Sequence, residues 1–386
     1  MTPAARYAAA IEVLDQWIVG RPLEQALTHW ARGSRYAGSK DRAAVRDHVF
    51  DAVRCLGRCR ALGGSGTGRG VILGLLKLQG IAPENVFNGE GHAPAALTTS
   101  ERDMSVDPPD AMADIPNWLR PKLAARAPSD VQALAASFAE RAPLWLRVNL
   151  RRATCAEAAE SLIAEGVATR PHPTLVTALE VTENPRRMRQ TAAYANGLVE
   201  PQDLSVQAAM ARVDWPKQGR ILDYCAGGGG KALALADHSE AVIFAHDINV
   251  KRMADLAPRA ARAGVAITTI APDDVMQEVP YDAVLVDAPC SGSGTWRRDP
   301  EAKWRLTADR LDELVALQAD ILAKAAELVA ADGMLIYMTC SLFHVENEDQ
   351  VDAFLAAHPE WRRMAQHCDT MLTASDGFFS ATLSRV

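Results

Sequence analysis

Two cysteines occupy positions that are more typical of reactive thiols than of residues packed in a core. Cys290 follows a proline in the stretch DAPCSGSG, directly after an apolar run, and Cys340 ends a second apolar run in IYMTCSL. A single cysteine at the end of a strand is most often a buried core residue. Two of them, each at the end of its own predicted strand and each followed by serine, indicate a pair of reactive thiols.

A pair of thiols suits the methylation of carbon 5 of a pyrimidine. That carbon is a poor nucleophile, so a thiolate must first add to carbon 6 and turn the ring into an enamine. The enzyme must then remove the carbon-5 proton and expel the thiolate, a step that a second ionisable group assists. Asp287, just before the proline motif, is placed to stabilise the adduct, and the proline would fix the direction of the Cys290 thiol. We expect Ser291 to Gly294 to leave space for an extruded base.

A glycine-rich stretch, LDYCAGGGGKALALA, follows another apolar run and opens a predicted helix. Gly227 to Gly230 would let the backbone pass close to a ligand, and a helix N-terminus favours an anionic group. The stretch is not a Walker loop, because Ala232 stands where serine or threonine would hold magnesium, and it lacks the G-x-G-x-x-G spacing of dinucleotide sites. Asp247 ends the next apolar run, where a carboxylate commonly binds ribose hydroxyls. A nucleoside without a phosphate fits, and S-adenosylmethionine is such a ligand.

The segment from Gly219 onward predicts the fold that would bring these residues together. Short apolar runs alternate there with helix-length segments, as in a doubly wound parallel sheet. The predicted strands are RILDYC, AVIFAHD, AITTI, YDAVLVDA and GMLIYMTC. Ligands of such sheets bind at the carboxyl ends of the strands, where both cysteines lie. The expected fold class is therefore α/β, with a Rossmann-like domain over residues 201–386.

The first eighty residues predict an all-α bundle. Apolar residues recur there at helical spacing in three segments, the third starting at Ser39. Four arginines on that third segment are separated by multiples of four and so lie on one face. They are Arg42, Arg46, Arg54 and Arg58. The net charge of −7 argues against a protein coated in positive charge, but nine basic residues against three acids from Arg32 to Arg69 indicate a local RNA-binding surface, with a merely solvated face as the alternative.

The middle of the chain divides into two parts. Residues 81–115 are rich in proline, glycine and polar residues without a period, which is typical of a linker or a long loop. Residues 116–200 predict a helix from Pro116 to about Ala142 and then a small α/β module that binds RNA. In that module LWLRVNL alternates like a strand, and a helix is expected from Cys155 to Ala164.

The bulk composition favours a globular protein, with 48% apolar and 23% charged residues. The sequence contains neither a run of eighteen apolar residues nor a basic N-terminal region followed by an apolar one, so we expect a cytoplasmic protein with no membrane span. Seven irregularly spaced cysteines indicate free thiols in a reducing compartment. No metal site is predicted, because Cys55 and Cys59 have no second pair with the spacing of zinc ligands.

Together these motifs resemble the RsmB/Nop/Sun family of RNA cytosine-5 methyltransferases. The resemblance runs from about Trp145 to the C-terminus and rests on LRVNLRR, VEPQDLSVQAAM, DYCAGGGGK, DAPCSGSGTWRRDPEAKWR, YMTCSLFHVENEDQV and DGFFSATLSR. The two cysteine motifs carry most of its specificity. The helical N-terminus, roughly Ala5 to Leu78, is similar to the NusB-like RNA-binding domain of the bacterial ribosomal members.

The resemblance implies roles for individual residues. Cys340 attacks carbon 6, and Cys290 assists release. The cofactor is S-adenosylmethionine, and the residues that bind it are Cys225, Ala226, Gly227, Gly228, Gly229, Gly230, Lys231, Asp247 and Asp287. One more acid follows the third strand, and of Asp273 and Asp274 we prefer Asp273. Lys231 would reach either the methionine carboxylate or a carboxylate of the site, and the basic residues that would meet RNA phosphate or orient the cysteine loop are Arg297, Arg298 and Lys303.

The sequence thus predicts a bacterial RNA cytosine-5 methyltransferase. Small-subunit ribosomal RNA is the favoured substrate because of the NusB-like region, and transfer RNA is the second candidate. The rival interpretation is a non-catalytic RNA-binding protein with a degenerate methyltransferase domain. The presence of both cysteines and of Asp287 argues against it. Gly228, Ala232 and His344 depart from the proline, threonine and proline that the family usually has, which puts the rigidity of the loops in question more than the activity.

Overall fold

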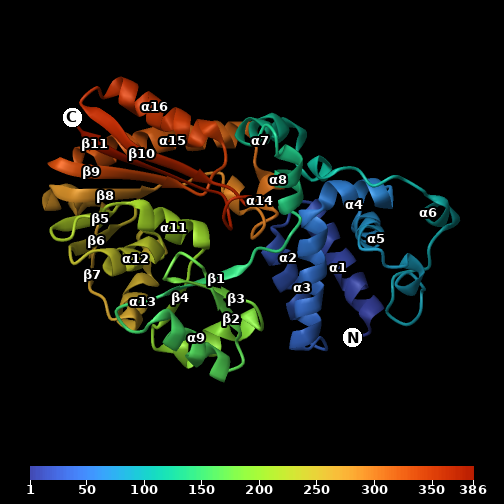
Figure 1. Cartoon of the computed structure of the whole chain (residues 1–386). Helices are drawn as coiled ribbons and strands as arrows, with labels where there is room; N and C mark the ends of the chain where they lie inside the picture. The colour runs from blue at the N-terminus through green and yellow to red at the C-terminus, as the bar shows by residue number, and fades with distance from the viewer. The chain divides into compact units, whose positions relative to one another are not determined.

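The computed structural model describes residues 1–386, which form two compact units. Unit 1 consists of Met1–Arg141 together with Trp296–Arg305, and unit 2 of Ala142–Thr295 together with Leu306–Val386. Figure 1 follows the chain from its helical N-terminal part to the strands near its C-terminus. None of the helices is both long enough and apolar enough to cross a membrane.

Unit 1 begins with helices whose apolar faces meet in one core, and residues 1–80 form no strand, as predicted. The helices are α1 Pro3–Ile18, α2 Leu23–Gly33, α3 Ser39–Arg54, α4 Leu56–Gly63 and α5 Gly68–Leu78. The Thr2 hydroxyl accepts a hydrogen bond from the N–H of Ala5 and so caps α1. Helices α4 and α5 cross at backbone contact, because a Cβ atom on Gly63 or Gly74 would lie 1.8 Å from a carbonyl oxygen of the other helix.

The prediction of a four-arginine basic face on one helix is wrong. Helix α3 ends at Arg54, and Arg58 lies on the next helix. Arg54 is 6% exposed, and its guanidinium donates to the carbonyl oxygen of Arg297 and to the Asp51 carboxylate. Arg58 donates to the buried carboxylate of Asp114 at 2.5 Å. The spacing of four extends across the break between α3 and α4, and these two arginines hold unit 1 together instead of facing solvent.

Residues 296–305, which include the short helix α14 Ala302–Arg305, belong to the same packing. The Lys303 side chain is fully buried, and its ammonium donates to the carbonyl oxygen of Arg54 at 2.8 Å. Burial lowers the pKa of Lys303 to about 8. Trp304 donates its indole N–H to the carbonyl oxygen of Val53. The predicted phosphate contact of Lys303 is therefore wrong, because its charge lies inside unit 1.

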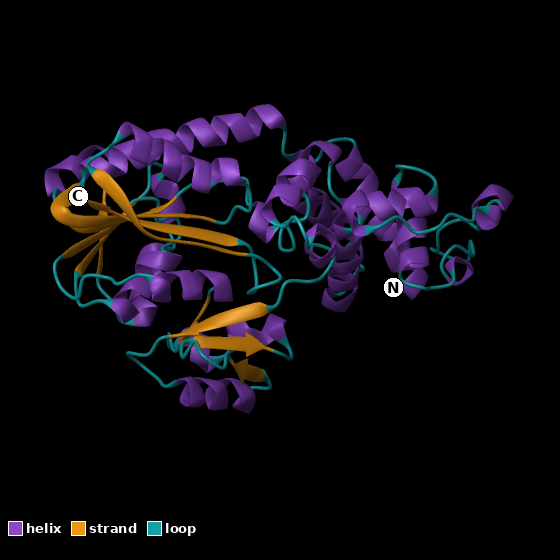
Figure 2. Ribbon diagram, turned by 45° about the horizontal axis from the view of Figure 1, so that its top comes forward, coloured by secondary structure: helices purple, strands orange, loops and turns teal.

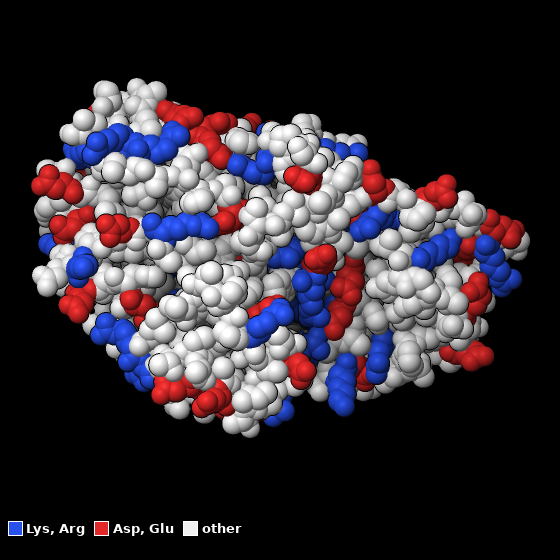
Figure 3. Space-filling view, in the orientation of Figure 1, with Lys and Arg blue, Asp and Glu red and all other residues white.

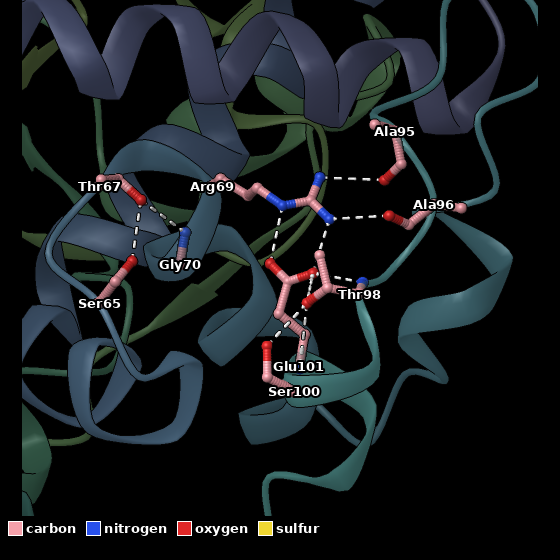
Figure 4. A network of polar contacts seen from close by, with 9 residues as sticks. All are labelled: Ser65, Thr67, Arg69, Gly70, Ala95, Ala96, Thr98, Ser100 and Glu101. Carbon is pink, nitrogen blue, oxygen red and sulfur yellow. Dashed lines mark hydrogen bonds and ion pairs between the residues drawn. The ribbon is translucent and has the colours of Figure 1, made fainter.

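Arg69 of α5 ties down the stretch that is rich in proline and glycine. Its guanidinium donates to both carboxylate oxygens of Glu101 in α6 (Thr99–Asp103) and to the carbonyl oxygens of Ala95 and Ala96 (Figure 4). The guanidinium carbon also lies 4.6 Å from the centroid of the Phe87 ring. The hydrogen bonds from Arg69 lower the pKa of Glu101 to about 2. This stretch thus packs as part of unit 1, while its limits at residues 81 and 115 stay a prediction.

The single helix predicted from Pro116 to about Ala142 is wrong. The structure has two short helices there, α7 Arg120–Arg126 and α8 Val131–Ser137. Pro128 separates them, because it has no N–H to donate and disfavours helical geometry at the residue before it.

Unit 2 begins with a small antiparallel sheet. Its strands are β1 Leu144–Val148, β2 Thr169–Pro171, β3 Ala178–Val181 and β4 Val199–Pro201, in the order β2-β3-β1-β4. Its helices are α9 Cys155–Ala164 and α10 Ala192–Ala195. Leu162 of α9 packs with Leu146 and Leu179 of the sheet. Buried Arg147 of β1 forms an ion pair with Asp237, which joins the small sheet to the rest of unit 2.

The main sheet of unit 2 has seven strands in the order β10-β11-β9-β8-β5-β6-β7. The strands are β5 Arg220–Asp223, β6 Val242–His246, β7 Ile267–Ile270, β8 Tyr281–Asp287, β9 Val329–Thr339, β10 Trp361–Asp369 and β11 Phe378–Arg385. Strands β5 to β9 pair in parallel, while β11 pairs antiparallel with both β9 and β10. All five strands predicted from Gly219 onward are present, and the Rossmann-like fold class is confirmed.

Helices cover both faces of the main sheet (Figures 1 and 2). Those on one face are α15 Ala308–Glu327 and α16 Glu348–Ala357, and those on the other are α11 Leu204–Arg212, α12 Gly230–His238 and α13 Leu256–Ala263. The apolar core has two corresponding layers, with Phe354 packed near Tyr337 in one and Leu235 near Ile336 in the other. The chain reverses its direction across the sheet between β5 and β8, which is where ligands of this fold bind.

Candidate functional site

Four neighbouring parallel strands carry the polar residues of the site at their carboxyl ends. Asp223 ends β5 and Asp287 ends β8, while Asp247 directly follows β6 and Cys340 directly follows β9. The strands lie in the order β9-β8-β5-β6, so these four side chains share one edge of the sheet. The edge includes the point where the chain reverses direction, so this is the expected ligand site.

The two cysteines approach each other within hydrogen-bond distance. Cys290 Sγ and Cys340 Sγ lie 3.3 Å apart, and both residues are partly buried. The hydrogen bond from Cys290 lowers the pKa of Cys340. The same contact raises the pKa of Cys290. This arrangement favours Cys340 as the thiolate and Cys290 as its protonated partner.

Asp287 and Lys231 form an ion pair beside the cysteines. Lys231 Nζ lies 2.6 Å from Asp287 Oδ2. Burial opposes the charge of the lysine, but Asp287 raises the pKa of Lys231 above its ordinary value, so the lysine stays charged. Its positive charge in turn favours the thiolate of Cys340. Of the two contacts predicted for Lys231, the structure has the one with a carboxylate of the site.

The glycine loop between β5 and α12 bends through left-handed backbone conformations. Gly227 has a φ of +51° and Gly229 a φ of +77°. A Cβ atom on Gly229 would lie 2.0 Å from a side-chain carbon of Leu256, so only glycine fits there without displacement. The N–H of Gly227 donates to Asp247 Oδ2 at 3.0 Å, and the N–H of Asn249 donates to Oδ1 at 2.9 Å. The loop and Asp247 therefore form one rigid wall.

The remaining loop residues have structural contacts. The N–H of Ala226 donates to the carbonyl oxygen of His246, and the carbonyl oxygen of Gly228 accepts from the Arg259 guanidinium. Burial raises the pKa of the Cys225 thiol, which disfavours its thiolate form. These contacts hold the loop against the ends of the neighbouring strands.

Asp223 is a further candidate site residue, which the sequence did not single out. It is 1% exposed, and neither of its carboxylate oxygens has a hydrogen-bond partner of normal geometry. Burial raises the pKa of Asp223 to about 7. Burial outweighs the attraction of the Lys231 charge and the weak contact with the N–H of Ala232, so a cationic ligand group at this wall would stabilise the carboxylate further. The signal was an acid at the end of a strand, directly before the glycine loop.

Two exposed features border this wall. Ile248, directly after Asp247, is 81% exposed, and a flat apolar ligand would remove it from water. Asp273 and Asp274 are both exposed in a short 3-10 helix after β7, and Asp274 accepts a hydrogen bond from Gln277. The preference for Asp273 as a cofactor residue stays a prediction.

The segment from Ser291 to Gly294 does not leave the open space that its small residues predicted. Ser293 is fully buried, and its Oγ lies 3.1 Å from Ser341 Oγ. A Cβ atom on Gly294 would lie 2.2 Å from the carbonyl oxygen of Gly377. The residues are small because the loops pack tightly against each other. Ser291 and Ser341 also donate to Glu346, a buried acid that the sequence analysis did not single out.

Comparisons with protein families match most of the second half of the chain. Residues 211–383 match the family model described as 16S rRNA methyltransferase RsmB/F. Residues 115–186 match the ferredoxin-like domain of the RsmF/B-like methyltransferases.

Curated relatives carry the name Ribosomal RNA small subunit methyltransferase B. The protein of Yersinia pestis bv. Antiqua (strain Angola) is 32% identical over 269 residues, which cover 68% of this chain and 61% of the relative. The protein of Xanthomonas campestris pv. campestris is 34% identical over 248 residues, which cover 62% of this chain and 56% of the relative. The chain thus spans about three fifths of the length of these relatives.

Solved structures share the fold. PH0851 superposes with a TM-score of 0.77 at 22% identity, over 100% of this chain and 99% of the other. NSun6 from Pyrococcus horikoshii, crystallised with SFG, superposes with a TM-score of 0.61 at 17% identity, over 70% of this chain and 98% of the other. At these identities the likeness concerns the fold alone.

Proposed function

Since the chain belongs to the RsmB/F methyltransferase family, we propose that it methylates carbon 5 of a cytosine in RNA, with small-subunit ribosomal RNA as the substrate. The observation that supports this best is the pair of sulfur atoms 3.3 Å apart beside Asp287 and Lys231. Carbon-5 chemistry needs one thiolate to add and a second group to assist release, and this site offers both.

The residues of the site fit S-adenosylmethionine, which supplies the methyl group when bound. The buried carboxylate of Asp223, which has no hydrogen-bond partner of normal geometry, suits the ammonium group of the methionine part. Asp247 suits the ribose hydroxyls, and exposed Ile248 offers an apolar surface to the adenine ring. The left-handed glycines let the backbone approach the ligand closely.

The protonation states of the two cysteines determine their roles in the reaction. Cys340, with its lowered pKa, attacks carbon 6, and the Lys231–Asp287 pair supplies through Asp287 the proton that ring nitrogen 3 takes up as the adduct forms. Once the Cys340 sulfur is bonded to carbon, it no longer accepts the hydrogen bond that chiefly raises the pKa of Cys290. Cys290 can then ionise, accept the carbon-5 proton and so let the bond between Cys340 and carbon 6 break.

We expect Cys290→Ala to trap the covalent intermediate. Addition to carbon 6 and methyl transfer need only Cys340, whereas loss of the carbon-5 proton would lack its base. A protein–RNA species should therefore accumulate on denaturing gels and depend on S-adenosylmethionine. Cys155→Ala, which changes a cysteine outside the site, is the control and should show no such species. Accumulation in Cys340→Ala instead would mean that the two roles are reversed.

The RNA-binding surface of unit 1 must be sought away from Arg54 and Arg58. Arg32 at the end of α2, Lys40 at the start of α3 and Arg35 between the two helices are exposed and form no ion pair. Tyr36 lies among them and is 74% exposed, which suits stacking on an unpaired base. Figure 3 shows acidic and basic side chains interspersed on the face that it draws. We therefore expect RNA to bind a local cluster of basic residues and not a uniformly positive surface.

Replacing Arg32, Arg35 and Lys40 together by alanine should weaken RNA binding. Loss of three phosphate contacts should reduce the salt dependence of the affinity by about 2 units of slope. The measurement is RNA affinity over a salt series, with cofactor affinity, expected to be unchanged, from calorimetry. A control variant that removes the exposed charges of Arg102, Arg310 and Lys324 should keep the slope. An unchanged slope in the first variant would make this cluster a merely solvated face.

Transfer RNA is the second candidate substrate, and a non-catalytic RNA-binding protein is the rival class. The names of the curated relatives favour ribosomal RNA. Methyl transfer by the purified protein to isolated small-subunit RNA, compared with transfer RNA, separates the first two. The rival class predicts no transfer to either.

A further inference from the structure

A carboxylate without exposure to solvent lies directly behind the two cysteine loops. Glu346 ends the 3-10 helix His344–Glu346, and its side chain is fully buried. Its Oε1 accepts hydrogen bonds from the N–H of Ser291 at 2.8 Å and from the side-chain amide of Gln318 at 3.0 Å. Its Oε2 accepts from the hydroxyls of Ser291 and Ser341, both at 2.5 Å.

These four donors saturate the carboxylate. An ionised carboxylate only accepts hydrogen bonds, and its two oxygens offer about four positions. Burying such a charge is costly unless its hydrogen bonds are satisfied, as they are here. Three of the four come from Ser291 and Ser341, the residues that directly follow Cys290 and Cys340. One side chain therefore holds the neighbours of both cysteines.

Further hydrogen bonds connect the loop that follows Cys290 with the loop that follows Cys340. Ser293 Oγ accepts from the N–H of Leu342 at 2.8 Å, and the N–H of Gly294 donates to the carbonyl oxygen of Cys340 at 2.9 Å. Gln318 of α15 donates to the carbonyl oxygen of Pro289 as well as to Glu346. The separation of the two sulfur atoms thus depends on a buried network with Glu346 at its centre.

We propose that Glu346 is a positioning residue, which holds the Cys290 thiol within hydrogen-bond reach of Cys340 and so sets how much of Cys340 is thiolate. The proposal rests on the proposed function for its consequence in catalysis. Its claim about the cysteines concerns the free protein and can be tested without RNA.

The position of Glu346 and its charge predict opposite effects on the pKa of Cys340. The groups that act on the Cys340 thiol are Cys290, Asp287, Lys231 and Glu346. Cys290 and Lys231 favour the thiolate, whereas the negative charge of Glu346 disfavours it and raises the pKa of Cys340. If Glu346 acted only through its charge, its neutralisation would make Cys340 more reactive. If it acts by positioning Cys290, neutralisation makes Cys340 less reactive.

The test is Glu346→Gln in the full chain, which keeps the shape of the side chain and removes its charge. The rate of iodoacetamide alkylation at Cys340 is measured against pH, with the modified cysteine identified by mass spectrometry. We expect the midpoint of this profile to rise by about one pH unit, because losing a hydrogen bond to a charged group weakens the thiolate about tenfold. Methyl transfer should fall about tenfold in kcat with little change in the KM for S-adenosylmethionine.

Two further variants separate positioning from a loss of folding. In Cys290→Ala the hydrogen bond is already absent, so adding Glu346→Gln should produce no further rise in the midpoint. Ser341→Ala removes one donor, keeps the carboxylate and should raise the midpoint in the same direction. Asp349→Asn removes an exposed charge nearby on α16 and is the matched control, with an unchanged profile expected.

A midpoint that falls or stays constant in Glu346→Gln would overturn the proposal, even if activity is lost. So would a full further rise when Glu346→Gln is added to Cys290→Ala. If instead the alkylation profile moves as expected but the wild-type protein methylates no RNA, the proposed function fails and the positioning role stands.

Discussion

Cys340→Ala should lose methyl transfer by on the order of 10⁴-fold or more, while its affinity for S-adenosylmethionine changes little. The structure offers no substitute nucleophile. Cys290 Sγ lies 3.3 Å from the Cys340 sulfur and so away from the position that attacks carbon 6; the hydrogen bond to Cys340 is lost in this variant, but burial still raises the pKa of Cys290, as it does that of Cys225. Single-turnover methylation of RNA and calorimetric cofactor titration measure the two quantities.

Cys155→Ala is a suitable control for this prediction. Cys155 begins α9, which packs with the small antiparallel sheet and not with the main sheet that carries the site, so this variant should keep full activity. Normal turnover by Cys340→Ala would remove the covalent mechanism. Loss of cofactor affinity together with activity would mean that Cys340 acts in the cofactor site or in folding.

Asp223→Asn should weaken S-adenosylmethionine binding by about 10- to 100-fold, since a hydrogen-bonded ion pair with the ammonium group would be lost. The carboxylate is buried and has no hydrogen-bond partner of normal geometry, so a cation gains more there than at an exposed acid. Calorimetry or equilibrium dialysis measures the dissociation constant. Asp332→Asn, at an exposed position in β9, is the matched control and should bind normally.

The same residue predicts a pH dependence of binding. Asp223 has a pKa of about 7 in the free protein, and a bound ammonium group would lower it. Binding therefore releases a proton below pH 7, and the affinity should rise as the pH increases from 5.5 to 7, below the range in which an α-amino group loses its proton. This rise should be absent in Asp223→Asn. An equal rise in both proteins would assign it to another group.

The main sheet could be predicted from sequence because its strands are buried on both faces. Each strand is then a short apolar run, and the residue after it lies at the edge where ligands bind, as Asp247 and Cys340 do. The pairing of Cys290 with Cys340 followed from the same logic. The sequence could not give their separation, because this depends on contacts between loops that lie far apart along the chain.

The helices of unit 1 were harder to predict from the sequence, because the periodicity of apolar residues does not reveal where a helix is interrupted. Arg54 and Arg58 looked like one basic face, but α3 ends at Arg54 and both side chains turn to buried partners. Lys303 looked exposed because lysine usually is, yet it caps a carbonyl group within unit 1. Glu346 was not predicted, because two of its partners, Ser291 and Gln318, become its neighbours only in the folded protein.

The central claim is methylation of carbon 5 of a cytosine in small-subunit ribosomal RNA through Cys340. Bisulfite sequencing of that RNA tests it most directly, in a strain without the gene and in the same strain carrying either wild-type protein or Cys340→Ala. We predict a cytosine that resists bisulfite conversion only when the wild-type protein is present. An identical pattern of resistant cytosines in all three strains, or restoration of the site by Cys340→Ala, would contradict the claim.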